Sequence, residues 1–135
     1  MSTIRVVVAE VGCEAEIREI DPGLESMQKI VEGDIEMLRL NGHIFMVVNE
    51  EGRLRRMPPN RVFTVADGRQ FNPGITDYAK ANPTTTRVFQ ILGPMFVSKS
   101  GGGKFVSLTE EEAEEVRQIL NTAQIVFDSA EVLTE

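Results

Sequence analysis

The sequence has little of the chemistry on which most catalytic and metal centres depend. Its 135 residues include one histidine and one cysteine, which excludes an internal disulfide and any centre built from several of either residue. No apolar run approaches the roughly 20 residues that span a bilayer, and residues 1–5 show no signal-peptide core. We therefore expect a cytoplasmic protein with no membrane contact, no metal and no cofactor.

The composition is that of an ordinary folded domain. Apolar residues make up 41% of the chain and charged residues 26%, far from the range in which chains stay disordered. A chain of 135 residues can bury one sizeable core, so we expect residues 1–135 to form a single domain. The formal net charge of -7 argues against direct binding of nucleic acid, which requires a basic face.

The first third of the chain predicts two strands, a helix and a hairpin. Residues 4–11 and 15–20 are strand-like, and Asp21-Pro22 predicts an N-cap and first helical residue, with a helix that ends near Gly33. Two further strand-like segments flank Asn41-Gly42, the dipeptide best suited to a type I′ turn. They cover residues 35–40 and 43–49.

The middle of the chain is less regular. Residues 49–61 contain Pro58 and Pro59 and predict an irregular connection that lies on the surface. Asp67-Gly68 predicts a turn between a short strand at 62–65 and the region of Phe71. A long loop over 72–86 follows, and loops of this length usually carry function.

The last third predicts bent strands and a well-capped helix. Strands at 87–92 and 95–98 are interrupted by Gly93-Pro94, which predicts a bend or bulge. Thr109 and Glu112 form a capping box for a helix that extends to about Asn121. The segment 123–135 predicts an extra C-terminal strand and a tail. Because strands dominate and come as hairpins, we expect an α+β fold, with an antiparallel or mixed sheet and two helices packed on one face.

Three features suggest sites and have simpler interpretations. His43 follows a turn, and a Cys13–His43 dyad is a weak alternative to an ordinary surface residue. The Gly101-Gly102-Gly103-Lys104 stretch lacks the spacing of a phosphate-binding loop, because Phe105 follows the lysine; a hairpin tip is favoured. The glutamates at 110–115 favour the positive end of a helix dipole, although they also suggest a patch that imitates DNA or binds a divalent cation.

Local basicity in an acidic chain is the more specific signal. Between residues 49 and 61, four arginines stand against two glutamates. Guanidinium groups suit phosphate and carboxylate oxygens, so this segment is the predicted ligand site. Alternatively, the arginines pair with Glu50, Glu51 and other acids. The candidate ligand-binding residues are Arg53, Arg55, Arg56, Asn60 and Arg61.

Several motifs together resemble an uncharacterised family of small proteins, encoded by bacteriophages and other mobile elements, whose domain is of unknown function. The resemblance covers most of residues 4–120, and only the loop at 72–86 and the tail at 123–135 extend beyond the family pattern. The motifs are Arg18-Glu19-Ile20-Asp21, Leu24 with Met27-Gln28, Val31-Glu32-Gly33-Asp34-Ile35-Glu36, Asn49-Glu50-Glu51-Gly52, Pro58-Pro59-Asn60-Arg61 and Phe105-Val106-Ser107-Leu108-Thr109-Glu110-Glu111.

The resemblance implies a genetic setting and no particular chemistry. Together with the scarcity of catalytic residues, it leads us to expect a non-enzymatic accessory protein that binds a small anionic ligand, such as a nucleotide immune signal, and so counters host defence. The alternative is an acidic inhibitor that occupies the nucleic-acid site of a host restriction or defence enzyme. A third alternative, an enzyme whose carboxylates use a borrowed metal, has less support. A homo-oligomer is compatible with each.

Overall fold

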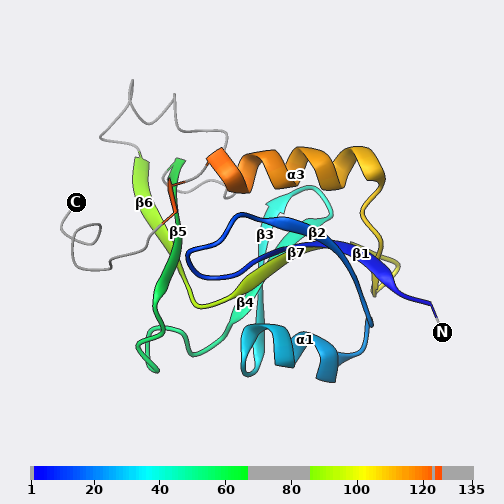
Figure 1. The fold of residues 1–135 in the computed structure, drawn as a ribbon, viewed down its shortest axis with the longest axis horizontal. Helices are drawn as coiled ribbons and strands as arrows, with labels where there is room; N and C mark the ends of the chain where they lie inside the picture. Colours follow the sequence, from blue (N-terminus) through cyan, green and yellow to red (C-terminus); the bar gives the residue numbers. More distant parts are fainter. Residues whose placement is uncertain (1, 67–85, 123, 126–135) are drawn as a thin grey trace.

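The structure, a computed structural model, describes residues 2–66, 86–122, 124 and 125. Strands dominate it, and two helices interrupt their order (Figure 1). The elements are β1 (Ile4–Ala9), β2 (Glu16–Ile20), α1 (Leu24–Val31), β3 (Ile35–Asn41), β4 (Ile44–Asn49), β5 (Pro59–Ala66), β6 (Thr86–Leu92), β7 (Met95–Gly101), β8 (Lys104–Val106), α3 (Glu110–Thr122) and β9 (Gln124–Ile125).

The strands form two sheets. The larger sheet has six strands in the order β2-β1-β7-β4-β3, with β8 pairing β7 beyond the end of β1, and the smaller sheet has the order β6-β5-β9. Every strand pair between described residues is antiparallel. The predicted α+β class is therefore confirmed. The chain passes from the large sheet to the small one after β4 and returns to the large sheet before β7. The small sheet lies at the left of Figure 1.

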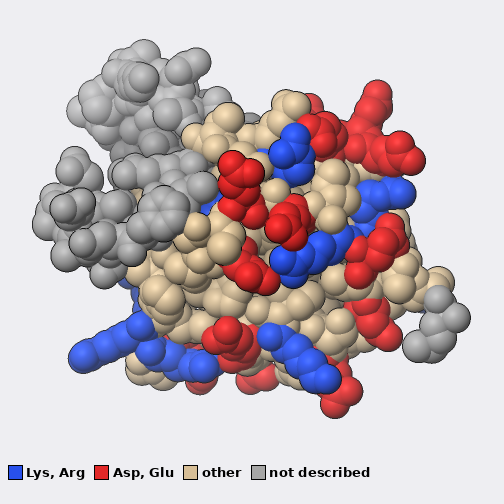
Figure 2. Space-filling view, in the orientation of Figure 1, with Lys and Arg blue, Asp and Glu red and all other residues tan. Residues whose placement is uncertain are grey.

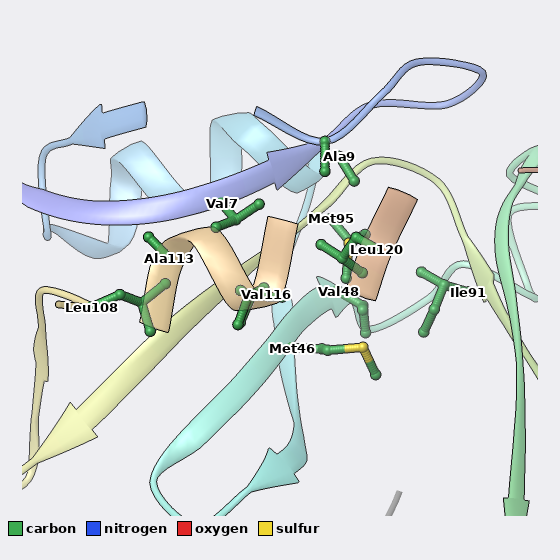
Figure 3. Close-up of a cluster of buried hydrophobic side chains, with 12 residues drawn as sticks. Val7, Ala9, Met46, Val48, Ile91, Met95, Leu108, Ala113, Val116 and Leu120 are labelled. Carbon is green, nitrogen blue, oxygen red and sulfur yellow. The ribbon is translucent and has the colours of Figure 1, made fainter. Parts of the chain in front are cut away.

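The two helices pack on opposite faces of the large sheet, so the expectation that they share one face is wrong. On one face, Leu108 and the α3 residues Ala113, Val116 and Leu120 cover alternate residues of the central strands, including Val7 and Met46 (Figure 3). On the other face, Met27 and Val31 of α1 cover Val6, Val8, Val47 and Phe96. Side chains alternate between the faces of a strand, so β1, β4 and β7 must be apolar at consecutive positions.

The ends of both helices follow from nearby polar groups. Thr109 and Glu112 form the predicted capping box: the Glu112 amide donates to Thr109 Oγ1 at 3.0 Å, and the Thr109 amide donates to Glu112 Oε1 at 2.9 Å. At α1 the N-cap is Gly23, not Asp21. The Asp21 carboxylate instead accepts the Gly23 amide at 2.7 Å, so the first helical residue is Leu24 and not Pro22.

The hairpin over residues 35–49 is confirmed, but its turn lies one residue later than predicted: Asn41 belongs to β3, and Gly42, with a φ of 52°, and His43 join β3 to β4. The predicted β7–β8 tip is confirmed, since Gly102 and Gly103 join these strands with φ of 60° and 78°. At Gly93, with a φ of 82°, the chain does more than bend, because it leaves the small sheet and enters the large one. The left-handed region favours glycine at each of these positions.

Two other expectations need correction or lie partly outside the described residues. The segment at 49–61 is not wholly an irregular surface connection, because β5 begins at Pro59, and the first residue of a strand tolerates a missing amide. β5 pairs with β6, whereas Phe71 and 67–85 lie outside the described residues. The expected C-terminal strand is present as β9, which pairs with β5; residues 123 and 126–135 are not described. None of the described helices is long and apolar enough for a membrane span.

Candidate functional site

The arginine-rich connection between β4 and β5 is a single helical turn. The Arg55 amide donates to the Glu51 carbonyl at 2.8 Å and the Met57 amide donates to the Gly52 carbonyl at 2.9 Å. Arg56 ends the turn in the left-handed conformation, with a φ of 55°, as in a Schellman motif. The turn holds Arg53, Arg55 and Arg56 exposed to solvent. Figure 2 shows basic side chains at the lower left, where this connection lies in Figure 1.

This turn is attached to the carboxyl end of α1. The Asn49 side chain, 5% exposed, donates from Nδ2 to the Val31 carbonyl at 2.9 Å and accepts the Glu51 amide at 2.7 Å. Arg55 Nη1 donates to the Glu32 carbonyl at 2.5 Å. The last carbonyls of a helix have no partner within the helix, so both side chains supply missing donors. Asn49 and Arg55 therefore fix the connection against α1.

Asn60 is buried completely and holds the two sheets together. Its Nδ2 donates to the Ala9 carbonyl at the end of β1, at 2.8 Å, and to the Gly93 carbonyl before β7, at 2.9 Å. Its Oδ1 accepts from Arg61 Nη1 at 2.7 Å. Both amide hydrogens are thus used within the protein. The expectation that Asn60 contacts a ligand has no support in this geometry.

Arg61 is also fully buried, and its guanidinium binds backbone carbonyls. Nε donates to the Leu120 carbonyl in the last turn of α3 at 2.9 Å, and Nη2 donates to the Cys13 carbonyl between β1 and β2 at 2.7 Å. Burial away from water lowers the pKa of Arg61, but a guanidinium remains charged. The carboxyl end of a helix favours a cation. The predicted role of Arg61 as a surface ligand contact is corrected: it joins β5 to α3 and to the β1–β2 turn.

The four arginines therefore do not form one solvent-facing cluster. Arg61 lies in the interior, and Arg55 is bound to a helix carbonyl. Among the described residues, Arg53 and Arg56 make neither an ion pair nor a side-chain hydrogen bond, so the alternative that they are neutralised by Glu50 and Glu51 is not seen either. An anion site at this connection would depend on Arg53 and Arg56, with the free edge of Arg55.

A cleft of about 440 Å³ opens beside the connection, where the edge of the large sheet meets β6. This volume suits a small organic ligand. Its lining comes from β3 and β4, from the connection, and from β6: Glu36, Leu38, Val48, Asn49, Glu50, Glu51, Gly52, Arg53, Leu54, Gln90, Ile91 and Leu92. Of the predicted site residues, only Arg53 contributes to it.

The charge of the cleft differs from the charge expected of an anion pocket. Three carboxylates, from Glu36, Glu50 and Glu51, stand against the guanidinium of Arg53. A polyphosphate would meet more repulsion than attraction there. The remaining lining is mostly aliphatic, including Leu38 and Ile91. The cleft therefore suits a compact ligand with hydrogen-bond donors for the carboxylates and one acceptor group for the guanidinium.

Gln90, which lines the cleft, has an unused side-chain donor. Its Nε2 is buried and has no hydrogen-bond partner among the described residues. A buried donor without an acceptor costs about 1–3 kcal/mol, so such groups are uncommon in proteins. The sequence offered no signal for this residue, because a single glutamine within a strand has no distinctive pattern. Gln90 and Arg53 thus both bring side-chain donors without a described partner to the lining of the cleft.

The acidic helix α3 is partly neutralised by its neighbours. The Glu112 carboxylate accepts hydrogen bonds from Lys99 Nζ, at 3.0 Å, and from the Thr109 amide. The pKa of Glu112 is lowered mainly by the hydrogen bond from Thr109 and, to a smaller extent, by Lys99. Arg117 lowers the pKa of Glu114 through a paired contact. In the part of α3 that the structure describes, Glu110, Glu111 and Glu115 have no such partner. Acidic side chains gather at the upper right of Figure 2, over the amino end of α3.

The weaker alternatives lose support from the topology. β1 and β4 both run antiparallel to β7, so Cys13, which follows β1, and His43, which precedes β4, lie at opposite ends of the large sheet. No group of three acidic, histidine or cysteine side chains among the described residues is placed to hold a metal ion. Lys104 is the first residue of β8 and pairs with Gly101, next to the hairpin tip that the sequence predicted for this stretch.

The fold defines a small α+β domain of two antiparallel sheets joined by buried polar contacts. A family model described as "Domain of unknown function (DUF3846)" matches residues 4–121. The chain belongs to this family, since the match covers most of its length. Comparisons with curated proteins and with solved structures found no match to the chain.

Proposed function

We propose that the protein is a non-enzymatic accessory protein of phage or mobile-element origin that binds a small polar ligand in the cleft beside β6. Binding would withhold the ligand from a host process such as immune signalling. The genetic setting rests on the family resemblance of the sequence motifs. The binding function rests on one observation: a cleft of ligand size is lined by Gln90, whose buried Nε2 has no acceptor among the described residues.

The donors of two residues that line the cleft call for an acceptor group on the ligand. Gln90 Nε2 and the Arg53 guanidinium both require an acceptor, and a carboxylate or a single phosphate group supplies oxygens for both. A ligand oxygen that reaches Gln90 removes the cost of its unpaired amide, so this contact contributes more to affinity than a contact with an already solvated donor.

The carboxylates call for a donor group on the ligand. Glu36, Glu50 and Glu51 accept hydrogen bonds and carry negative charge, so they favour an amine, an amidine or the amino edge of a base. The aliphatic lining accommodates an apolar part of the ligand. We therefore propose a ligand with balanced or nearly balanced charge, such as an amino acid or an amino-acid derivative, in place of the small anionic ligand expected from four clustered arginines.

A thermal-shift screen of the full chain tests this proposal. The probes are nucleosides, nucleoside monophosphates, nucleoside triphosphates, amino acids and inorganic phosphate. We expect stabilisation by a compound that combines an acceptor with a donor group, and weaker or no stabilisation by triphosphates. Calorimetric titration of the compound found in the screen then gives the affinity.

Two variants and one control locate the site. Gln90→Met keeps the length and volume of the side chain and removes its amide, so we expect ligand affinity to fall at least tenfold while the free protein gains about 1 kcal/mol of stability. Arg53→Ala should weaken binding without changing stability. Lys104→Ala removes an equally exposed cation far from the cleft and should change neither quantity. Unchanged affinity in both Gln90→Met and Arg53→Ala contradicts the proposal.

A second candidate function has one observation in its favour. Glu110, Glu111 and Glu115 carry charges that no described neighbour neutralises, and an acidic face of this kind could occupy the basic site of a host defence enzyme. Replacing these three glutamates with glutamine should then abolish inhibition, and binding should weaken steeply with salt. Gln90→Met should have no effect on that inhibition, which separates the two candidates.

A further inference from the structure

One edge of the large sheet is suited to a second copy of the chain. β2 is the outermost strand, and among the described residues it pairs only with β1. Its outer backbone groups are therefore available to another strand. Ile17, the second residue of β2, is 41% exposed although it is a large apolar residue. An exposed apolar residue on an unpaired edge indicates a surface that could add a strand.

The side chains of β2 limit how two copies can pair. A two-fold axis normal to the sheet places the same face of both copies on the same side, and side chains alternate between the two faces along a strand. A residue of one copy can therefore lie opposite a residue of the other copy only if their sequence numbers differ by zero or an even number. If the axis passes through Ile17, each Glu16 lies opposite Arg18 of the second copy, and the two Ile17 side chains lie opposite each other.

Every other axis through β2 is less favourable. Axes through Glu16, Arg18 or Glu19 place two like charges directly opposite each other, which destabilises an antiparallel pair. An axis through Ile20 places Glu19 opposite Asp21. The register through Ile17 is the one in which all opposing charges are of opposite sign.

The existing ion pair of β2 fits the same arrangement. Arg18 Nη2 lies 3.1 Å from Glu16 Oε1 and 3.2 Å from Glu10 Oε2 on the same chain. Arg18 and Glu16 oppose Val6 and Val8 of β1, so both lie on the α1 side of the sheet. Two copies would therefore form a closed ring of four alternating charges on that side, with the Ile17 pair on the other side.

The opposite edge of the sheet lacks this complementarity. β3 is also an edge strand, and its Met37 is 39% exposed. Its charged residues, Glu36 and Arg39, are separated by an odd number of positions, so they cannot oppose each other under the same kind of axis. β3 thus provides a matched comparison: similar exposure and similar edge position, but no charge pairing.

We infer that the protein forms a homodimer through antiparallel pairing of its β2 strands, with Ile17 on the two-fold axis, so that the two large sheets become continuous. This inference is independent of the proposed ligand site, because the cleft is lined by β3, β4 and β6 and not by β2.

Sedimentation or light scattering of the full chain over a range of concentrations tests the inference. The expected result is a mass twice that of one chain at high concentration. Ile17→Lys places two lysines opposite each other and should raise the dimer dissociation constant at least tenfold. Met37→Lys makes the same change on the β3 edge and should leave the dissociation constant unchanged. A monomer at every concentration, or a dimer lost with Met37→Lys and retained with Ile17→Lys, overturns the inference.

A charge exchange tests the register. Glu16→Arg and Arg18→Glu should each weaken the dimer about tenfold or more, because each places like charges opposite each other twice. The double variant restores opposite signs and should restore most of the affinity. Far-UV circular dichroism confirms that each variant is folded, and if Ile17→Lys does not fold, the exchange series alone decides. A double variant no tighter than the single variants rules out the register.

Discussion

Replacing the buried Arg61 with methionine should destabilise the protein severely. Methionine fills much of the same space and removes the guanidinium, which now donates to Leu120 O, Cys13 O and Asn60 Oδ1. Each buried oxygen left without its donor costs about 1–3 kcal/mol. Methionine carries no charge that must be desolvated, and this offsets part of the lost free energy of unfolding. We expect a net loss of about 3 kcal/mol in the free energy of unfolding, or about 10 °C in Tm.

Urea denaturation followed by circular dichroism measures this loss. Arg53→Met is the matched control, because it makes the same chemical change on the same connection at an exposed side chain that has no hydrogen bond or ion pair among the described residues. Its effect should stay within about 0.5 kcal/mol. The Arg61 contribution should also be insensitive to salt, since buried charges are screened poorly. A loss below about 1 kcal/mol for Arg61→Met would refute the structural role assigned to Arg61.

Three further predictions concern the turns and the helix cap. Gly33→Ala should cost about 1–3 kcal/mol by urea denaturation, because a Cβ there would lie 2.7 Å from Asn49 Nδ2 and 2.8 Å from Arg55 Nη1; a neutral substitution would show that this contact relaxes freely. Arg56→Gly should raise Tm by a few degrees, about 0.5–1 kcal/mol, because glycine adopts the left-handed φ of 55° without strain; a lower Tm contradicts this. Because the pKa of Glu112 is lowered in the folded protein, its carboxyl binds a proton more readily in the unfolded chain. The stabilisation from ionised Glu112 is therefore fully present above the pKa of an ordinary carboxyl group. It is lost as the pH falls through the folded pKa. Glu112→Gln should therefore reduce stability at neutral pH and flatten the acid limb of the stability profile, and an unchanged limb would contradict the assignment.

Local patterns predicted the parts of the fold that depend on neighbours in the sequence. Asn41-Gly42 predicted the β3–β4 turn to within one residue of its observed place at Gly42 and His43, and Thr109 with Glu112 predicted the start of α3. The N-cap of α1 was placed two residues early because the Asp21 carboxylate closes a turn around Gly23 before the helix begins.

The sequence carries a signal for the placement of the two helices in its consecutive apolar strand residues. Val6, Val7 and Val8 are consecutive and all buried, and such a run indicates a strand covered on both faces. The three strands at the centre of the large sheet share this property. Weighing it against hairpin topology would have placed α1 and α3 on opposite faces.

The candidate site was hardest to predict because its residues depend on distant partners. Arg61 looks like its exposed neighbours in the sequence, but its contacts are to Leu120 and Cys13, 59 and 48 positions away. Gln90 becomes notable only because no residue that the structure describes accepts its amide hydrogens. Composition revealed a basic segment but could not distinguish guanidinium groups that hold the fold together from those available to a ligand.

The point at which the chain leaves the large sheet adjoins the point at which it returns. The Gly93 amide donates to the Pro58 carbonyl at 2.7 Å, and at the far end of the same excursion Ala66 stands opposite Thr86 in the β5–β6 ladder. The residues that join Ala66 to Thr86 therefore connect two adjacent ends. Relatives could lengthen or shorten that segment by many residues, at an entropic cost that grows only slowly with length, while every strand register described here stays the same.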